Sequence, residues 1–205
     1  MELSQVLKER RSVRRFKDTP VDPGIIKDIL EGASLAPETD TCSYYLGVIT
    51  DKAAKEALAQ ATLWADWIAG APVIFAVCCD ISWDIAGQAD DSYGVTGNRL
   101  RYNHEIIEFL RQHPDRKACK KLLCASPNYI VAQHIVLGAV SHGLRGCIVD
   151  FMDTERMNTI LGLPEHVSCQ VLVPVGVADE TPREWEAFPM EERVFYDNWG
   201  CKAGR

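Results

Sequence analysis

The hydrophobic and polar positions of this chain alternate between the spacing of amphipathic helices and that of buried strands. Apolar residues that recur three and four positions apart predict helices. Short, nearly continuous apolar runs such as residues 72–79 predict strands that are covered on both faces. Together these patterns predict helices over about 2–10, 22–35, 51–69, 98–110, 128–142 and 153–161, and strands over 45–50, 72–79, 146–149 and 169–177.

Local signals set several of these boundaries. Asp22-Pro23 supplies a cap and a first-turn proline, and Asp51 and Asp153 are expected to cap the helices that they begin. Ser126-Pro127 predicts the start of the longest helix, which Gly143 ends. Trp64 and Trp67 are expected in the core, because large aromatic side chains mostly serve packing. His134 is expected to be a hydrogen-bonded core histidine. Helices alternating with buried strands predict one layered domain, either α/β or α+β, over residues 1–205.

A basic segment interrupts an otherwise acidic chain. Six of the ten residues 8–17 are Lys or Arg, although the formal net charge is −7 and the pI is about 5.3. A nucleic-acid-binding domain would be basic as a whole, so this class of function is excluded. The segment is better matched to one local anion, such as a phosphate ester held by guanidinium groups. A solvated charged turn is the alternative.

The eight cysteines form no recognisable framework. They stand at positions 42, 78, 79, 119, 124, 147, 169 and 201, without a Cys-x-x-Cys pair or a His spacing that completes a zinc site. The N-terminus has no apolar signal-peptide core, and apolar runs such as residues 68–79 are too short to span a bilayer. We therefore expect a soluble, cytoplasmic protein with free thiols, no membrane contact and no metal. An iron–sulfur cluster or a zinc ion held by the cysteines is the alternative, which metal analysis would test.

No sequence motif supplies a catalytic nucleophile or a metal-bound water. Gly-x-Ser-x-Gly and His-Glu-x-x-His are both absent. An enzyme with this sequence would therefore need a cofactor to carry its reaction, and the basic segment would hold the phosphate of that cofactor.

An ordered series of short motifs resembles the FMN-dependent nitroreductase family across nearly the whole chain. Each motif is short and unspecific by itself, but the occurrence of all of them in the same order as in the family is specific. The matching stretches are Arg-Arg-Ser-Val-Arg-Arg-Phe at 10–16, Leu-Ala-Pro at 35–37, Ala-Gln-His at 132–134, Gly-Leu-Arg-Gly-Cys at 143–147, Leu-Gly-Leu-Pro-Glu at 161–165, the strand at 171–177, and Pro-Met-Glu-Glu at 189–192.

The resemblance implies an α+β three-layer sandwich, with a mixed central sheet flanked by helices, that forms an intertwined homodimer. It implies FMN at the dimer interface, and a ping-pong transfer of hydride from NAD(P)H to a nitroaromatic compound, a quinone or a similar small electrophile. Residues 80–125 would form a lid, and residues 180–205 would wrap the partner subunit.

By the same resemblance, Arg14 is the catalytic candidate. It would lie near the pyrimidine edge of the flavin, where a cation stabilises negative charge that develops during hydride transfer. Arg10 and Ser12 would bind the phosphate and the ribityl chain. The full set of cofactor-binding candidates is Arg10, Arg11, Ser12, Arg14, Thr41, Ser43, Val149 and Asp150.

Three departures from the family pattern bear on the activity. Thr41 and Ser43 replace amide side chains that would contact the flavin, and residues 187–188 (Ala-Phe) replace a cation near the phosphate. Asp150 stands where a Gly often lets the backbone approach the ring. A non-catalytic family member, which binds a flavin or a nucleotide without turnover, is therefore the alternative function.

Overall fold

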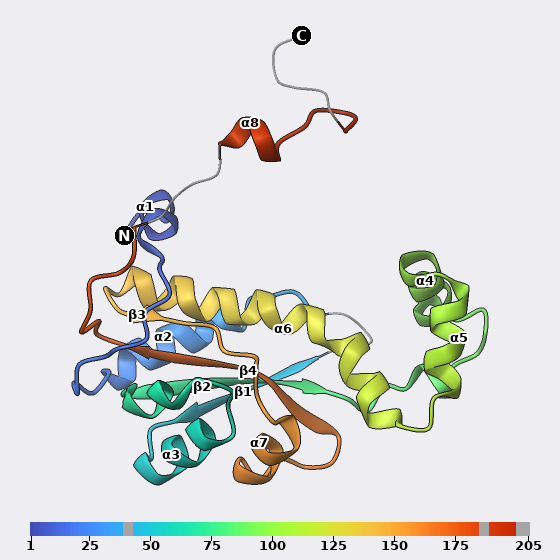
Figure 1. Cartoon of the computed structure of the whole chain (residues 1–205), viewed down its shortest axis with the longest axis horizontal. Helices are drawn as coiled ribbons and strands as arrows, with labels where there is room; N and C mark the ends of the chain where they lie inside the picture. The colour runs from blue at the N-terminus through green and yellow to red at the C-terminus, as the bar shows by residue number, and fades with distance from the viewer. Residues whose placement is uncertain (39–42, 185–188, 200–205) are drawn as a thin grey trace.

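The computed structural model describes residues 1–38, 43–184 and 189–199, and its centre is a four-stranded antiparallel sheet (Figure 1). The strand order is β1-β2-β4-β3. The strands are β1 (Tyr44–Ile49), β2 (Val73–Asp80), β3 (Arg145–Gly146) and β4 (Val167–Gly176). Within the described chain, the parallel pairing expected of a mixed sheet is confined to a single bridge between Ser12 and Gly146.

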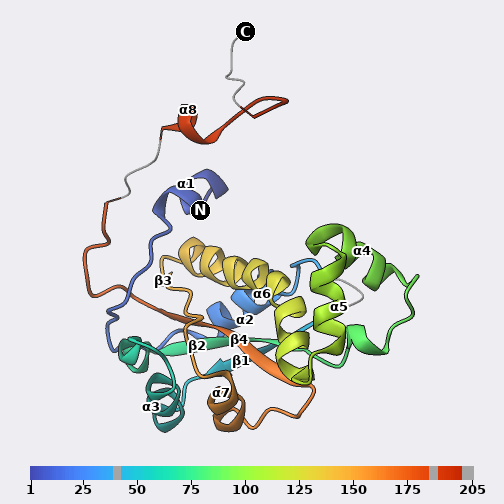
Figure 2. The same cartoon turned by 45° about the vertical axis from the view of Figure 1, so that its right-hand side comes forward.

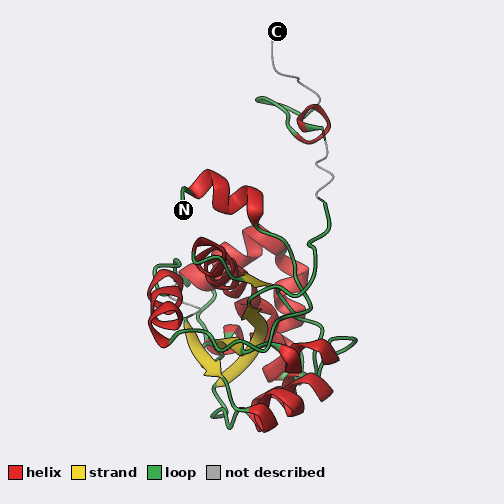
Figure 3. Ribbon diagram, turned by 90° about the vertical axis from the view of Figure 1, so that its left-hand side faces the viewer, coloured by secondary structure: helices red, strands yellow, loops and turns green. Residues whose placement is uncertain are grey.

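Helices cover both faces of the sheet and make the three layers that the sequence predicts (Figure 3). Alternate residues of β2 enter different cores. Val73, Phe75 and Val77 pack with α2 (Pro23–Ala33) and α6 (Arg116–Ser141). Ile74, Ala76 and Cys78 face α3 (Lys52–Gln60) and α7 (Thr154–Ile160). An antiparallel strand thus carries the continuous apolar run that usually marks a parallel one, because both of its faces are covered.

The longest helix begins twelve residues before the predicted position 128 and contains Pro127 in its interior. Asp115 is the actual cap, because its carboxylate accepts a hydrogen bond of 2.9 Å from the Ala118 backbone N–H. A proline within a helix cannot donate to the preceding turn, and Figure 1 shows that α6 bends along its course. Its length and mean hydropathy of 1.3 would suit a membrane span, but its apolar residues pack on the sheet.

The helix predicted over 51–69 is shorter than expected. Asp51 caps α3 as predicted, but α3 ends at Gln60 and a short 3-10 helix follows at Asp66–Gly70. Between them, Thr62 pairs with Met152, and Trp64 adopts a φ of 58° with 87% of its surface exposed. The expectation that Trp64 lies in the core is wrong, whereas Trp67 packs against Phe16 with ring centroids 6.4 Å apart.

Residues 80–125 are more ordered than the pattern suggests. They contain a short 3-10 helix (Ile85–Gly87), α4 (Tyr93–Tyr102), α5 (His104–Gln112) and the first turns of α6, beside which α4 and α5 lie (Figure 2). Asn103, with a φ of 80°, separates two helices where the pattern predicts one. A small separate core holds them together, formed by Ile85, Val95 and Ile107.

The chain begins with α1 (Leu3–Glu9) and ends in a segment that leaves the body of the protein (Figures 1 and 3). This segment contains α8 (Met190–Arg193), and its aromatic side chains Phe195, Tyr196 and Trp199 are exposed. The six cysteines that the structure describes are free and buried, while Cys42 and Cys201 lie outside the described residues. His134 is hydrogen-bonded as predicted, with its Nδ1 atom 3.1 Å from the Gly32 carbonyl oxygen, but it is only partly buried and does not lie in the core.

Candidate functional site

Three segments that are distant in sequence converge beside β3. They are residues 10–16, residues 60–67 and residues 146–153. The Val13 N–H donates to the Gly146 carbonyl at 3.3 Å, and the Leu63 N–H donates to the Phe151 carbonyl at 2.8 Å. Val13 is fully buried in the core that also contains Ala61 and Ala65. The basic segment is therefore held by a backbone hydrogen bond to Gly146 and by core contacts with residues 60–67, and it does not form a solvated charged turn.

The basic segment presents two cations without anionic partners. Arg10 ends α1, and the Arg14 backbone N–H donates to Glu180 Oε1 at 2.6 Å. Within the part of the chain that the structure describes, neither guanidinium forms a hydrogen bond or an ion pair. In an acidic chain this arrangement favours an external anion. Arg11 differs, because its Nη1 donates to the Lys8 and Arg10 carbonyls at 2.7 Å each.

Cys147 lies between these cations and the loop after β3. It is 5% exposed, and burial raises the pKa of its thiol. The guanidinium groups of Arg14 and Arg10 and a hydrogen bond with the Ser12 side chain oppose this shift in the pKa. The thiol is therefore protonated at neutral pH. Its electrostatic neighbours are also the predicted site residues, since they include Arg10, Ser12, Arg14 and Asp150.

Asp150 lies three residues after Cys147, and hydrogen bonds on both sides of it fix its position. Val149 exchanges two backbone hydrogen bonds with Leu172, at 2.9 and 2.8 Å. The Tyr129 hydroxyl, from α6, donates to Asp150 Oδ2 at 2.8 Å. Burial and the adjacent carboxylate raise the pKa of Tyr129 to about 12. The phenol thus stays protonated and orients the Asp150 carboxylate.

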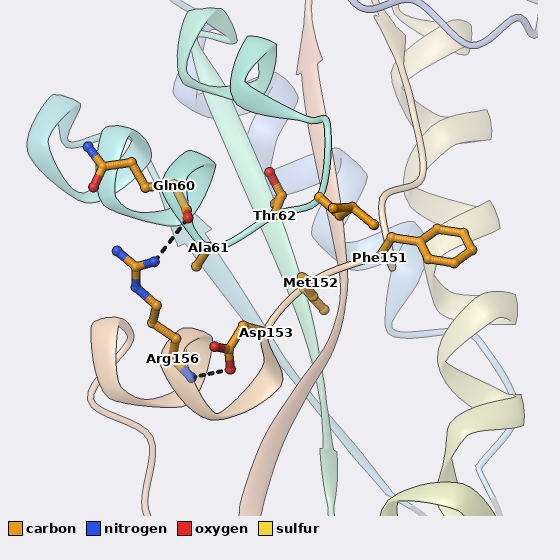
Figure 4. A pocket seen from close by; sticks show the side chains of 8 residues that line it. Gln60, Ala61, Thr62, Phe151, Met152, Asp153 and Arg156 are labelled. Atoms are coloured by element: carbon orange, nitrogen blue, oxygen red, sulfur yellow. Dashed lines mark hydrogen bonds between the residues drawn. The ribbon is translucent and has the colours of Figure 1, made fainter.

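A pocket of about 420 Å³ opens between residues 60–63 and 151–156 (Figure 4). Arg156 and Gln60 lie together at one side of it, where Arg156 Nη1 donates to the Gln60 carbonyl at 3.1 Å. The Phe151 ring points away from them, toward α6. The lining of the pocket begins at Phe151, one residue after Asp150, and its volume suits a planar multi-ring molecule. A second pocket of about 470 Å³ lies along β1.

The structure brings together most of the predicted site residues. Arg10, Ser12, Arg14 and Asp150 all lie near enough to Cys147 to influence the pKa of its thiol, and Val149, which directly precedes Asp150, is buried. Ser43 lies elsewhere, because its carbonyl accepts from the Asp80 N–H at the end of β2 that is remote from Gly146. Thr41 and residues 187–188 fall outside the described residues.

Sequence reasoning missed two residues of this site. Cys147 belonged to a quoted motif, but no sequence signal gave it a contact with Ser12. Tyr129 carried no signal at all, because only the packing of α6 beside the loop after β3 brings its hydroxyl to Asp150.

Comparison with known proteins agrees with this architecture. The sequence matches the family model for the nitroreductase family over residues 7–177. The chain therefore belongs to the nitroreductase family. The predicted family and the predicted α+β fold are both confirmed.

Individual relatives of this nitroreductase-family chain resemble it over almost its full length. An NADH dehydrogenase from Thermus thermophilus is 29% identical over 92% of both chains. A nitroreductase-family protein from Streptococcus pneumoniae has a TM-score of 0.71 at 22% identity, covering 95% of this chain and all of the other. An FMN-dependent nitroreductase from Clostridium difficile has a TM-score of 0.68 at 19% identity, covering 95% of this chain and 98% of the other.

The donor set at the site fits a phosphorylated flavin. The guanidinium groups of Arg10 and Arg14, which have no partner among the described residues, suit anionic groups. The Ser12 hydroxyl suits a polyol chain, and the pocket that begins at Phe151 suits a planar ring. Within the described residues, no cluster of His, Cys, Asp and Glu side chains is arranged to hold a metal ion.

Proposed function

We propose that this chain is an FMN-dependent oxidoreductase that passes hydride from NAD(P)H to a small electrophile such as a nitroaromatic compound or a quinone, in a ping-pong cycle. Membership of the nitroreductase family supports the oxidoreductase class. The observation that carries the proposal is the pair of guanidinium groups of Arg10 and Arg14, which lack hydrogen-bond and ion-pair partners among the described residues, beside Ser12 in an acidic chain. FMN supplies the hydride-accepting and hydride-donating chemistry.

The residues of the chain bind and orient the reactants. Arg10 and Ser12 hold the phosphate and the ribityl chain, and Arg14 places a positive charge where negative charge develops at the pyrimidine edge. Val149 and Cys147 are buried, so they exclude water from the side of the site that faces the protein core. The hydrogen bond from Tyr129 keeps the Asp150 carboxylate turned toward α6.

The position of Ser43 favours a homodimer. Ser43 bonds to Asp80, whereas the cationic cluster adjoins Gly146 at the Val73 end of β2. Eight extended residues span roughly 25 Å. If Ser43 contacts the same cofactor as Arg10, a second copy of the chain must supply it. The exposed aromatic residues of the 180–199 segment are suited to cover such a partner.

A visible absorption spectrum with an FMN titration tests the proposal. We expect bound flavin in the purified protein, or saturable binding of added FMN, followed by flavin-dependent oxidation of NADH or NADPH. Flavin binding without oxidation of either nucleotide would favour the non-catalytic alternative. A protein that ignores saturating FMN would overturn the cofactor assignment. Analytical ultracentrifugation tests the homodimer. The buried free thiols suit the expected cytoplasmic location.

A further inference from the structure

We propose that Tyr129 and Asp150 select the electron acceptor by charge, so that this site accepts neutral or cationic acceptors and disfavours anionic ones. This inference rests on the proposed function, because it concerns the acceptor of that same site. It assigns a specificity role to a residue pair that the sequence pattern did not link.

The backbone holds Asp150 rigidly from both sides. The preceding residue, Val149, is bonded through its N–H and its carbonyl to Leu172 of β4. The following residue, Phe151, accepts a hydrogen bond from the Leu63 N–H at 2.8 Å. A carboxylate on such a backbone cannot swing away from an approaching anion as a carboxylate on a flexible surface loop could.

The side chain of Asp150 is also held in place. Tyr129 Oη donates to Asp150 Oδ2 at 2.8 Å, and among the described residues no Lys or Arg lies within ion-pairing distance of this carboxylate. In the proposed function, Arg10 would bind the phosphate and Arg14 would lie at the pyrimidine edge, so the cofactor would engage both cations. The carboxylate of Asp150 is then left to face the acceptor.

If residues 80–125 form the lid that the sequence predicts, the acceptor would enter beside α6. Tyr129 belongs to α6, which begins inside the 80–125 segment. Phe151, 71% exposed, also points toward α6 (Figure 4). An acceptor between this segment and the flavin would therefore meet Tyr129, Asp150 and Phe151. An aromatic wall with one fixed negative charge suits an aromatic acceptor that is not an anion.

A matched pair of acceptors tests the proposal. 4-Nitrobenzamide and 4-nitrobenzoate are nearly equal in size and differ by one negative charge. With the holoenzyme we expect kcat/KM for the amide to exceed that for the carboxylate by about tenfold, since two charges a few ångströms apart interact measurably even at a partly exposed site. Most of the difference should appear in KM. Added salt should reduce it.

Two variants and a control test whether Asp150 and Tyr129 cause the preference for the amide. Asp150→Asn should raise the ratio of kcat/KM for the carboxylate to kcat/KM for the amide about five- to tenfold. Tyr129→Phe keeps the charge but frees the carboxylate, so it should lower the amide preference by about twofold. Glu31→Gln removes one negative charge from α2, where Glu31 pairs with the exposed Lys27, and should change neither value. It replaces a carboxylate that has no contact with Tyr129 or Asp150. An unchanged preference in Asp150→Asn, or an equal change in Glu31→Gln, would overturn the proposal.

Two further readouts do not depend on turnover. Dissociation constants of the two nitro compounds, from quenching of tryptophan fluorescence, should show the same change in preference in Asp150→Asn. An ultraviolet titration of flavin-free protein should show one tyrosine with a pKa of about 12, which Asp150→Asn lowers. If the titration is unchanged, the pair does not exist in solution and the proposal fails. Absence of flavin-dependent NAD(P)H oxidation would instead count against the proposed function, while the dissociation constants would still decide the charge preference.

Discussion

Ser12 and Gly146 form a parallel β-bridge that joins the basic segment to the sheet. The two residues are far apart in sequence, and the bridge fixes the direction in which the Arg10 and Arg14 side chains leave the backbone. On its other side Gly146 packs closely on β4, because a Cβ atom there would approach the Pro174 carbonyl oxygen to 3.0 Å and Val175 Cγ2 to 3.1 Å. The basic segment is therefore attached to the sheet through a residue whose own position depends on a close approach to β4.

Gly146→Ala should weaken both the fold and the site. The added methyl group would press on the β4 backbone, and we expect a loss of about 1–3 kcal/mol in the free energy of unfolding. FMN affinity should fall with it. The control is Gly97→Ala in α4, where a Cβ meets nothing within 4 Å and should stabilise the helix by about 0.5–1 kcal/mol. Urea unfolding measures the change in the free energy of unfolding of both variants. An unchanged free energy of unfolding in Gly146→Ala would contradict the prediction.

Arg10→Ala should weaken binding of the FMN phosphate and leave binding of the flavin ring unchanged. We expect FMN to bind about 10–100-fold more weakly, because a charge-assisted contact to the phosphate is lost. Riboflavin, which has no phosphate, should bind unchanged. Lys17→Ala removes one positive charge from the end of the same segment and is the control. Equal losses for FMN and riboflavin would contradict the role of Arg10.

Arg14→Ala should slow the reduction of bound flavin by NADH on the order of 100-fold. The stability should change by about 0.5 kcal/mol or less, because the Arg14 contact with Glu180 is made by its backbone N–H. Arg15→Ala is the control of equal charge, and its side chain bonds to the Asp179 carbonyl. Stopped-flow absorbance and thermal unfolding separate the two effects. Similar reduction rates in both variants would rule out a catalytic role for Arg14.

Asp84→Asn should loosen the 80–125 segment. Asp84 accepts two hydrogen bonds from Arg116, at 2.5 and 3.3 Å, and these bonds tie the segment to the first turn of α6. We expect a loss of about 1–3 kcal/mol in local stability, seen as faster hydrogen exchange over residues 85–112. Asp91→Asn, at an exposed position of the same segment, is the control.

The same contact predicts a pH dependence. The hydrogen bond from Arg116 lowers the pKa of Asp84 below its ordinary value of 3.8. A carboxylate whose pKa is lower in the folded state stabilises the fold at neutral pH, and this stabilisation is lost as the pH falls below about 4. Protection of the 80–125 segment should therefore decrease in acid in the natural protein. Asp84→Asn should show a smaller decrease, and equal acid sensitivity would contradict the assignment.

Local pattern was a reliable guide where neighbours in sequence decide the structure. Asp22, Asp51 and Asp153 cap helices as predicted, because a cap needs only a side-chain acceptor beside free N–H groups. The apolar run of β2 predicted burial on both faces. Pro127 shows the limit of this guide. A Ser-Pro pair is a strong start signal, but Asp115 starts the helix and packing of α6 on the sheet outweighs the hydrogen bond that is lost at the proline.

The sequence by itself determined the layered fold, the family and the cationic segment, because apolar period, turn residues and motif order are written along the chain. Only the tertiary structure decided which residues meet. The contacts of Cys147 with Ser12, of Tyr129 with Asp150 and of Leu63 with Phe151 follow from sheet register and helix packing. The sequence around each of these residues carries no sign of its partner, because the partner is distant in the chain. Such contacts therefore cannot be predicted from local patterns.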